Sequence, residues 1–341
     1  MIPSRNYHTS EYMNGRKREI DILKGIGIIL MIIGHIEFGE IIDKGIHGFH
    51  MVLFIWVSGF LHKSVNSNFK GWLLKKIRSL LVPYFFFGMC FIFIAGLQVV
   101  AHQKNIQDFT NHIIHLLFVN TEGLAVAGAI WYLTAIFFIE IIYVIVENNI
   151  KSDFVKMIMV CAIFAMGILI ATFNIKLPWG VGIAFVGVLF YHIGVCTKKY
   201  ETKLQELNRG YGIVFLIVGM LIIMLNSNVN MRLEKYGNPV MFVLGAIFTT
   251  IGLLKISYRI SLSKNILITE LNYIGRNSLV YLCLNEFFLF FLKKFLQYSN
   301  ILWLDVLSRI TVLLITLILL HIATIVFDLY PLRIFIGKKR K

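Results

Sequence analysis

Two ionisable side chains bracket an apolar stretch near the start of the chain, Lys24 and His35 in DILKGIGIILMIIGH (21–35). Their spacing of eleven residues is about three helical turns, so both lie on one face of a helix, about 16 Å apart along its axis. Imidazole suits general base catalysis near neutral pH, and an ionisable residue inside a membrane helix predicts function. The alternative is structural: His35 hydrogen-bonds a neighbouring helix, and Lys24 extends to the membrane interface.

A second histidine, His50, opens the apolar run FHMVLFIWVSGFL (49–61). We expect it at the outer end of a second membrane span, near the external face, where it could approach His35. The alternative is an ordinary interfacial histidine, because such positions are partly hydrated.

A basic cluster forms the third group of candidates. Lys75 and Arg78 lie in KKIR, directly before the apolar run LLVPYFFFG. Cationic side chains at this place suit the phosphate groups of a cytosolic donor, and the guanidinium geometry of arginine favours such contacts. The alternative is plain anchoring of a cytoplasmic loop by its positive charge.

The composition is that of an integral membrane protein. The chain has 341 residues, of which 58% are hydrophobic and 15% charged, and its mean hydropathy is +0.77. Its net charge of +15 is better explained by basic cytoplasmic loops than by binding of nucleic acid. The four cysteines lie in apolar runs without metal-ligand spacing, so we expect neither a metal site nor disulfides.

The hydropathy pattern predicts an all-α integral membrane fold with about ten transmembrane helices. The expected spans are 20–38, 49–65, 77–101, 129–147, 154–173, 178–197, 210–226, 237–256, 272–296 and 301–328. Trp131 and Tyr132 in the fourth span are expected in an outer aromatic belt.

The basic residues predict the orientation of these spans. With a cytoplasmic N-terminus, 25 of the 33 lysines and arginines fall on the cytoplasmic side and 8 outside. This asymmetry places both termini in the cytoplasm. We expect residues 1–18 to be a mobile basic cytoplasmic tail, 19–330 a single membrane domain, and 331–341 a second basic cytoplasmic tail.

Taken in order, the motifs resemble the membrane-bound acyltransferase type 3 family. The resemblance rests on Lys24 and His35 in the first span, FHMVLFIWVSGFL in the second, and the basic pair Lys75 and Arg78. It also rests on the later runs LLVPY, IWYL, LPW and YIGRNSLVY. The second-span motif is similar to that of the FHM-type branch, with its fucose 4-O-acetylase-like and polysaccharide-modifying members. Two positions depart from relatives: Ile136 stands where some carry glutamate, and Asn285 where many carry histidine.

The resemblance implies an integral-membrane O-acyltransferase of the bacterial cytoplasmic membrane. It would move an acyl group, expected to be acetyl, from cytoplasmic acetyl-CoA to a hydroxyl of a cell-surface polysaccharide or its lipid-linked glycan precursor. His35 would act as general base or carry the acyl group transiently, and His50 would orient the acceptor. Lys24, Lys75 and Arg78 would hold the donor's phosphates. The alternative is a protein of the same fold without transferase activity, in polysaccharide export or small-molecule transport.

Overall fold

The chain folds into an all-helical protein, as predicted. The computed structural model describes residues 17–65, 68–101, 105–118, 128–208, 210–296 and 302–338. Within these ranges there are helices and no strand, apart from one isolated bridge between Asn230 and Lys235.

The helices of the first half are α1 (Arg18–Ile36), α2 (Glu40–His47), α3 (His50–Phe60), α4 (Phe69–Lys76), η1 (Ile77–Leu81), α5 (Val82–Val100), α6 (Ile106–Leu117), η2 (Gly128–Ile130), α7 (Trp131–Asn149) and α8 (Asp153–Thr172). Those of the second half are η3 (Pro178–Gly180), α9 (Val181–Lys199), α10 (Glu201–Glu206), α11 (Gly210–Leu225), η4 (Met231–Leu233), α12 (Pro239–Ile260), α13 (Ile266–Arg276), α14 (Ser278–Leu292), η5 (Lys293–Phe295), α15 (Leu302–Asp328) and η6 (Leu332–Ile334).

Six helical segments of the described chain are long and apolar enough to cross a membrane. They are Phe69–Val100, Trp131–Asn149, Asp153–Thr172, Pro178–Lys199, Pro239–Ile260 and Leu302–Asp328. Two shorter apolar helices, α11 and α14, accompany them. By length and composition, the described chain therefore has six candidate spans, and the predicted number of ten is not confirmed. The first predicted span is a helix, but α1 carries four charged residues in its first seven, and α3 has only 11 residues.

Two other predicted spans differ from the helices that form. The second was expected to reach residue 65, but α3 ends at Phe60. The ninth, 272–296, is divided at Asn277 between the end of the amphipathic helix α13 and the apolar helix α14. After α3 the polar residues His62, Lys63 and Ser64 follow the apolar run, and at the second break Asn277 donates to the backbone carbonyl of Tyr273, where α13 ends.

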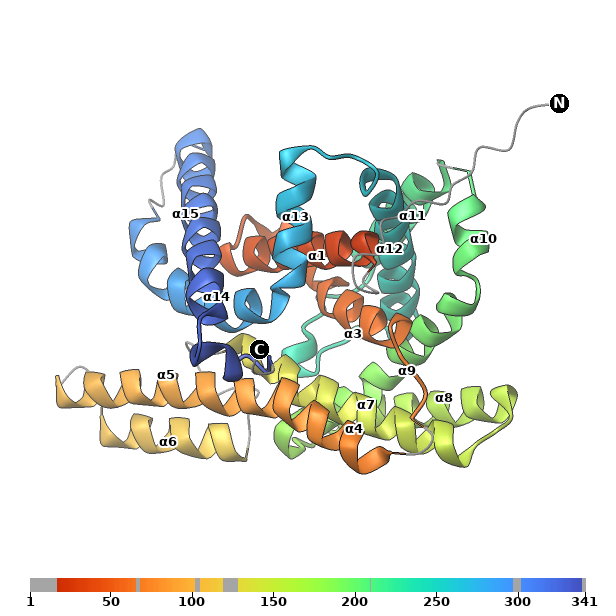
Figure 1. Ribbon diagram of the computed structural model, residues 1–341, viewed down its shortest axis with the longest axis horizontal. Helices are drawn as coiled ribbons and strands as arrows, with labels where there is room; N and C mark the ends of the chain where they lie inside the picture. Colours follow the sequence, from red (N-terminus) through yellow and green to blue (C-terminus); the bar gives the residue numbers. More distant parts are fainter. Residues whose placement is uncertain are drawn as a thin grey trace.

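The central helix α1 crosses the middle of the molecule (Figure 1). It packs against α3, α12, α13 and α14, while α4, η1 and α5 form one long rod along the lower edge, beside α6. The backbones of α1 and α13 touch where both are glycine. A Cβ on Gly25 would lie 2.1 Å from the carbonyl oxygen of Leu271, and one on Gly275 would lie 1.7 Å from that of Asp21. Small residues permit such close helix contacts in membranes.

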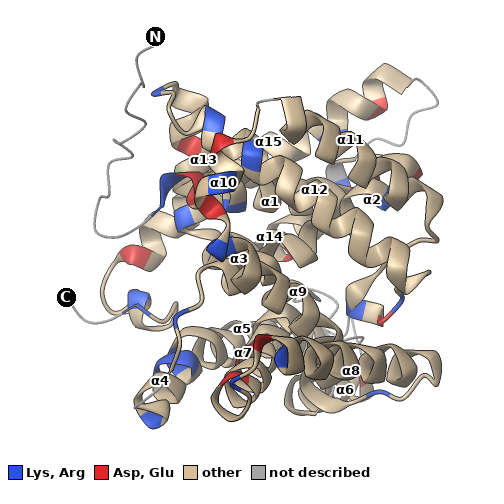
Figure 2. Ribbon diagram, turned by 90° about the vertical axis from the view of Figure 1, so that its right-hand side faces the viewer, with Lys and Arg blue, Asp and Glu red and all other residues tan. Residues whose placement is uncertain are grey.

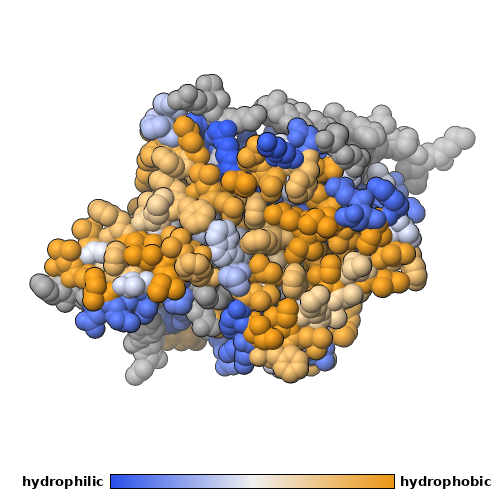
Figure 3. Space-filling model, turned by 90° about the horizontal axis from the view of Figure 1, so that it is seen from below, coloured by the Kyte–Doolittle hydropathy of each residue, from blue (hydrophilic) through white to orange (hydrophobic). Residues whose placement is uncertain are grey.

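The surface is broadly apolar, as expected for contact with lipid (Figure 3). Only a small part of α8 is buried, and large apolar side chains such as Phe154, Leu169 and Ile318 are exposed. Lysine and arginine gather toward one side of the described chain, at α4, α10 and the start of α1 (Figure 2). This distribution agrees with the charge asymmetry of the sequence, although the position of the membrane itself stays a prediction.

Candidate active site

A cavity of about 630 Å³ lies at the C-terminal end of α1. It is enclosed by the C-terminal part of α1, the helices α2, α3, α7 and α14, the short helices η2 and η5, and the segment between α11 and α12 that contains η4. The polar residues that line it are His35, Glu37, Asp43, His47, His50, Asn230, Arg232, Glu286 and Lys293. The cavity therefore contains both histidines that the sequence singled out, together with a third one.

His35 faces a carboxylate across the cavity. Its Nε2 atom lies 3.6 Å from Oε1 of Glu286 on α14. A carboxylate at this distance orients the imidazole and stabilises its protonated form, which is what a general base needs when it accepts a proton. The pair is therefore the candidate acid–base group of the cavity.

The end of α1 that carries His35 is held by α15. Arg309 donates hydrogen bonds to the backbone carbonyls of Ile36 and Glu37, which the helix itself leaves unpaired. The same guanidinium bonds Asp305 at 2.9 Å, so its own position is fixed. Glu37 adopts a left-handed conformation that ends α1 directly after His35.

His50 is held in one tautomer. Its Nδ1 lies 2.8 Å from the backbone oxygen of Ile46. Because a carbonyl oxygen only accepts, Nδ1 carries the proton, and Nε2 of the neutral ring is left as an acceptor. The ring is buried beneath His47, with the two ring centroids 5.3 Å apart.

The short helix α2 brings His47 into the cavity. Gly48 packs against Ile223 of α11 so closely that a Cβ would lie 2.4 Å from its Cγ2, and Gly45 lies against the flexible end of Met220. Lys44 also bonds the carbonyl of Met224 at 2.8 Å, at the end of α11. These contacts fix α2 as part of the cavity wall.

The predicted donor-binding residues are on other parts of the molecule. Lys24 pairs with Asp21 of its own helix at 3.3 Å. Arg78 lies in the π-helical turn η1, where it donates to the carbonyl of Lys338 at 2.9 Å. The side chain of Lys75 is exposed, while its neighbour Lys76 forms a 2.6 Å ion pair with the buried Glu140 of α7.

The two basic groups thus lie on elements with different neighbours. The helix α1 packs against α13 and α12, and η1 packs against α4, α5 and α7. The structure brings His35 and His50 to one cavity, but no contact of the described residues joins Lys24 to Lys75 or Arg78.

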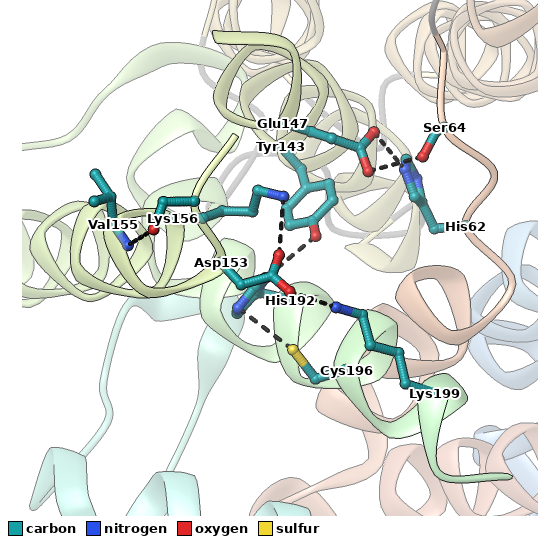
Figure 4. Close-up of polar contacts among 11 residues, drawn as sticks. His62, Ser64, Tyr143, Glu147, Asp153, Val155, Lys156, His192, Cys196 and Lys199 are labelled. Atoms are coloured by element: carbon teal, nitrogen blue, oxygen red, sulfur yellow. Dashed lines mark hydrogen bonds and ion pairs between the residues drawn. The ribbon is translucent and has the colours of Figure 1, made fainter. Parts of the chain in front are cut away.

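A second group of polar side chains lies at the other end of α3 (Figure 4). His62 bonds Glu147 at 3.0 Å through Nε2 and the hydroxyl of Tyr191 at 2.9 Å through Nδ1. His192 contacts the hydroxyl of Tyr143 at 3.2 Å and the thiol of Cys196 at 3.5 Å. No cluster of three or more metal-ligating side chains occurs in the described ranges.

A sequence model of the acyltransferase domain matches residues 17–327. The chain belongs to the acyltransferase 3 family. No curated protein and no solved structure matched the chain. Together with the apolar helices, membership of this family indicates a multi-pass membrane protein with an acyltransferase domain. The FHM-type branch stays a prediction.

Several residues that line this cavity, Glu286 among them, were not among the site residues predicted from the sequence, and one other was misjudged. Trp131 was expected in an outer aromatic belt, but it is only 4% exposed and lines the cavity. His47 and Asp43 were not singled out at all. A signal was present in the spacing of His47 and His50, which lie three residues apart on either side of Gly48.

Proposed function

We propose that the chain is an O-acyltransferase that moves an acetyl group from acetyl-CoA to a hydroxyl of a cell-surface polysaccharide or of its lipid-linked precursor. The single observation that supports this most is the pairing of His35 with Glu286 inside a cavity of about 630 Å³. Family membership supports the acyl transfer, and the cavity has room for an alcohol beside a thioester.

In the proposed reaction His35 removes the proton of the acceptor hydroxyl while the oxygen attacks the thioester carbonyl. Glu286 stabilises the imidazolium that forms. When the carbon–sulfur bond breaks, the imidazolium returns the proton to the thiolate of coenzyme A, so the histidine is regenerated. Nε2 of His50 accepts a hydrogen bond from the acceptor and orients it. A variant of this proposal has the acyl group carried for a time by His35.

The donor is proposed to bind from the cytoplasmic side, with its phosphates near Lys24, Lys75 and Arg78. The attraction is electrostatic, and the exposed Lys75 is available for it. Since Arg78 also bonds the carbonyl of Lys338, donor binding there would involve the segment that follows α15. The cellular site of the reaction is proposed to be the bacterial cytoplasmic membrane.

The test uses purified protein with acetyl-CoA. The acceptor is surface polysaccharide from cells that lack the gene, stripped of O-acyl groups by mild base. Transfer is followed by release of free thiol and by mass spectrometry of the polysaccharide. We expect acetylation by the parent protein and none by His35→Asn. A parent protein that never consumes acetyl-CoA, in cells or after purification, would contradict the proposal and favour a transport or export role.

A further inference from the structure

The helix α2 turns two polar side chains toward the cavity that the proposed mechanism does not use. Asp43 and His47 are four residues apart, so they share one face of the helix, and both line the cavity. Ile41 and Ile42 are exposed on the surface. The helix is therefore amphipathic, with its polar side toward the cavity.

Both side chains keep polar atoms without a partner. No hydrogen bond joins either ring nitrogen of His47 to another residue of the described chain. Oδ2 of Asp43 accepts a hydrogen bond from the backbone N–H of Gly39 at 3.3 Å, and the backbone N–H of Phe38 also stabilises this carboxylate, while the buried Oδ1 has no close donor in the described chain. A buried polar atom such as Oδ1 of Asp43 is nearly always paired, and leaving it unpaired costs about 1–3 kcal/mol, whereas the half-buried ring of His47 lines the cavity itself. Such atoms at the wall of a cavity fit a polar ligand.

The protonation of His47 decides which ligand fits. Burial, helped by the nearby His35, lowers the pKa of His47 below its ordinary value. The ring is thus neutral near pH 7, with one N–H donor and one acceptor nitrogen. A carboxylate and a neutral imidazole on adjacent turns match hydroxyl groups, since each hydroxyl both donates and accepts. An alcohol with a single hydroxyl would engage His35 and leave α2 unpaired.

We propose that Asp43 and His47 form a subsite that binds a hydroxyl of the acceptor next to the one that is acylated. The subsite selects acceptors with at least two neighbouring hydroxyls over simple alcohols. This inference rests on the proposed acyl transfer at His35, and it adds which part of the cavity holds the acceptor.

The test compares Asp43→Asn and His47→Gln with Glu40→Gln as the matched control. Glu40 lies on the same helix but is exposed and does not line the cavity. Steady-state transfer from acetyl-CoA to the base-treated polysaccharide gives KM and kcat. Loss of one such hydrogen bond should raise the KM for the polysaccharide about tenfold in either cavity variant. The kcat and the KM for acetyl-CoA should stay within about threefold of the parent.

Small alcohols test the selectivity directly. Propane-1,2-diol and propan-1-ol differ by one hydroxyl, and each is added as a competing inhibitor of transfer. The diol should inhibit the parent and Glu40→Gln more strongly than the simple alcohol does, and this preference should disappear in His47→Gln. Equal inhibition of the parent by both alcohols would overturn the inference.

The outcomes separate the subsite from the reaction itself. An unchanged polysaccharide KM in both cavity variants, or a fall in kcat alone, would overturn the subsite and leave the proposed function standing. A parent protein that transfers no acyl group would contradict the proposed function instead.

Discussion

The two ends of α3 carry two groups of histidines that differ in how their nitrogens are used. At the first end, His35, His47 and His50 border a cavity, and nitrogen atoms of His47 have no partner in the described chain. Beyond the other end, every ring nitrogen of His62 and His192 contacts a protein atom.

Because of this difference, we interpret the first group as a candidate site and the second as a structural contact between helices. The second group ties the segment after α3 to α7 and α9, because Glu147 accepts from both His62 and Ser64 and Lys198 donates to the carbonyl of His62. A fully paired polar network stabilises one packing and offers nothing to a ligand. In the cavity group some hydrogen-bonding atoms have no partner in the described chain. These atoms are available to bind a ligand or to accept a proton.

The largest expected effect is on His35. The variant His35→Asn should lower the rate of acyl transfer by about 10²–10⁴-fold, since it removes the general base. Its melting temperature should stay close to that of the parent, because within the described residues the 3.6 Å contact with Glu286 is the one polar contact that the side chain of His35 would lose. Transfer and thermal unfolding are measured on the same preparation. Full activity would contradict the role of His35, and loss of activity through unfolding would make it a structural residue.

The next effect concerns Glu286. The variant Glu286→Gln keeps the shape of the side chain but removes the charge that stabilises the imidazolium of His35. An opposite charge at the 3.6 Å distance of Glu286 shifts the pKa of its neighbour by about one to two units, so we expect a fall in kcat of about 10–100-fold. The KM for acetyl-CoA serves as an internal control and should hardly change. An unaffected kcat would show that His35 works without the carboxylate.

Much of the fold followed from the sequence, because hydrophobic runs require helices in a membrane whatever their neighbours are. Every predicted span contains a helix, and α1 carries Lys24 and His35 as expected. That these two residues lie on one helix could be predicted from their local spacing alone. The break of the ninth span at Asn277 was missed, because it depends on how α13 packs against α1.

The site was predicted only where a motif carried it. His35 and His50 were expected near each other, and they line one cavity. Asp43 and His47 belong to a short segment that reads as a loop, and only contacts with α11, 180 residues away, turn it into a wall of the cavity. Trp131 looked like an interfacial anchor because burial by distant elements is invisible in a local pattern.

A substitution in the group around His62 and His192 should lower the stability of the protein and leave the rate of acyl transfer unchanged. The variant His62→Ala removes the partner of Oε2 of Glu147 and of the hydroxyl of Tyr191, at a cost of about 1–3 kcal/mol, while Oε1 of Glu147 keeps its bond from Ser64. We expect a lower melting temperature in detergent and an unchanged kcat per folded molecule at low temperature. His321→Gln is a suitable control, since this side chain is 39% exposed and contacts Glu270 and Tyr273, which belong to neither group. A large loss of kcat without destabilisation would move His62 into the site.

The smallest effect is a pH dependence of stability that arises from His47. Burial lowers the pKa of this imidazole in the folded protein below its ordinary value of 6.5, so the unfolded chain binds more protons in the range between the two values. The free energy of unfolding should therefore rise as the pH increases through 6.5 and fall below it, by about 1.4 kcal/mol for each unit of pKa difference. Asp43 acts in the opposite direction and only near its own, more acidic range, since burial raises the pKa of its carboxyl. Melting curves are recorded between pH 5 and 8, about 1.5 units to either side of the ordinary pKa. The melting temperature should depend less steeply on pH for His47→Gln than for the parent. Equal slopes would mean that His47 is as well hydrated as a surface histidine, and the contrast between the two ends of α3 would then rest on His35 and His50 alone.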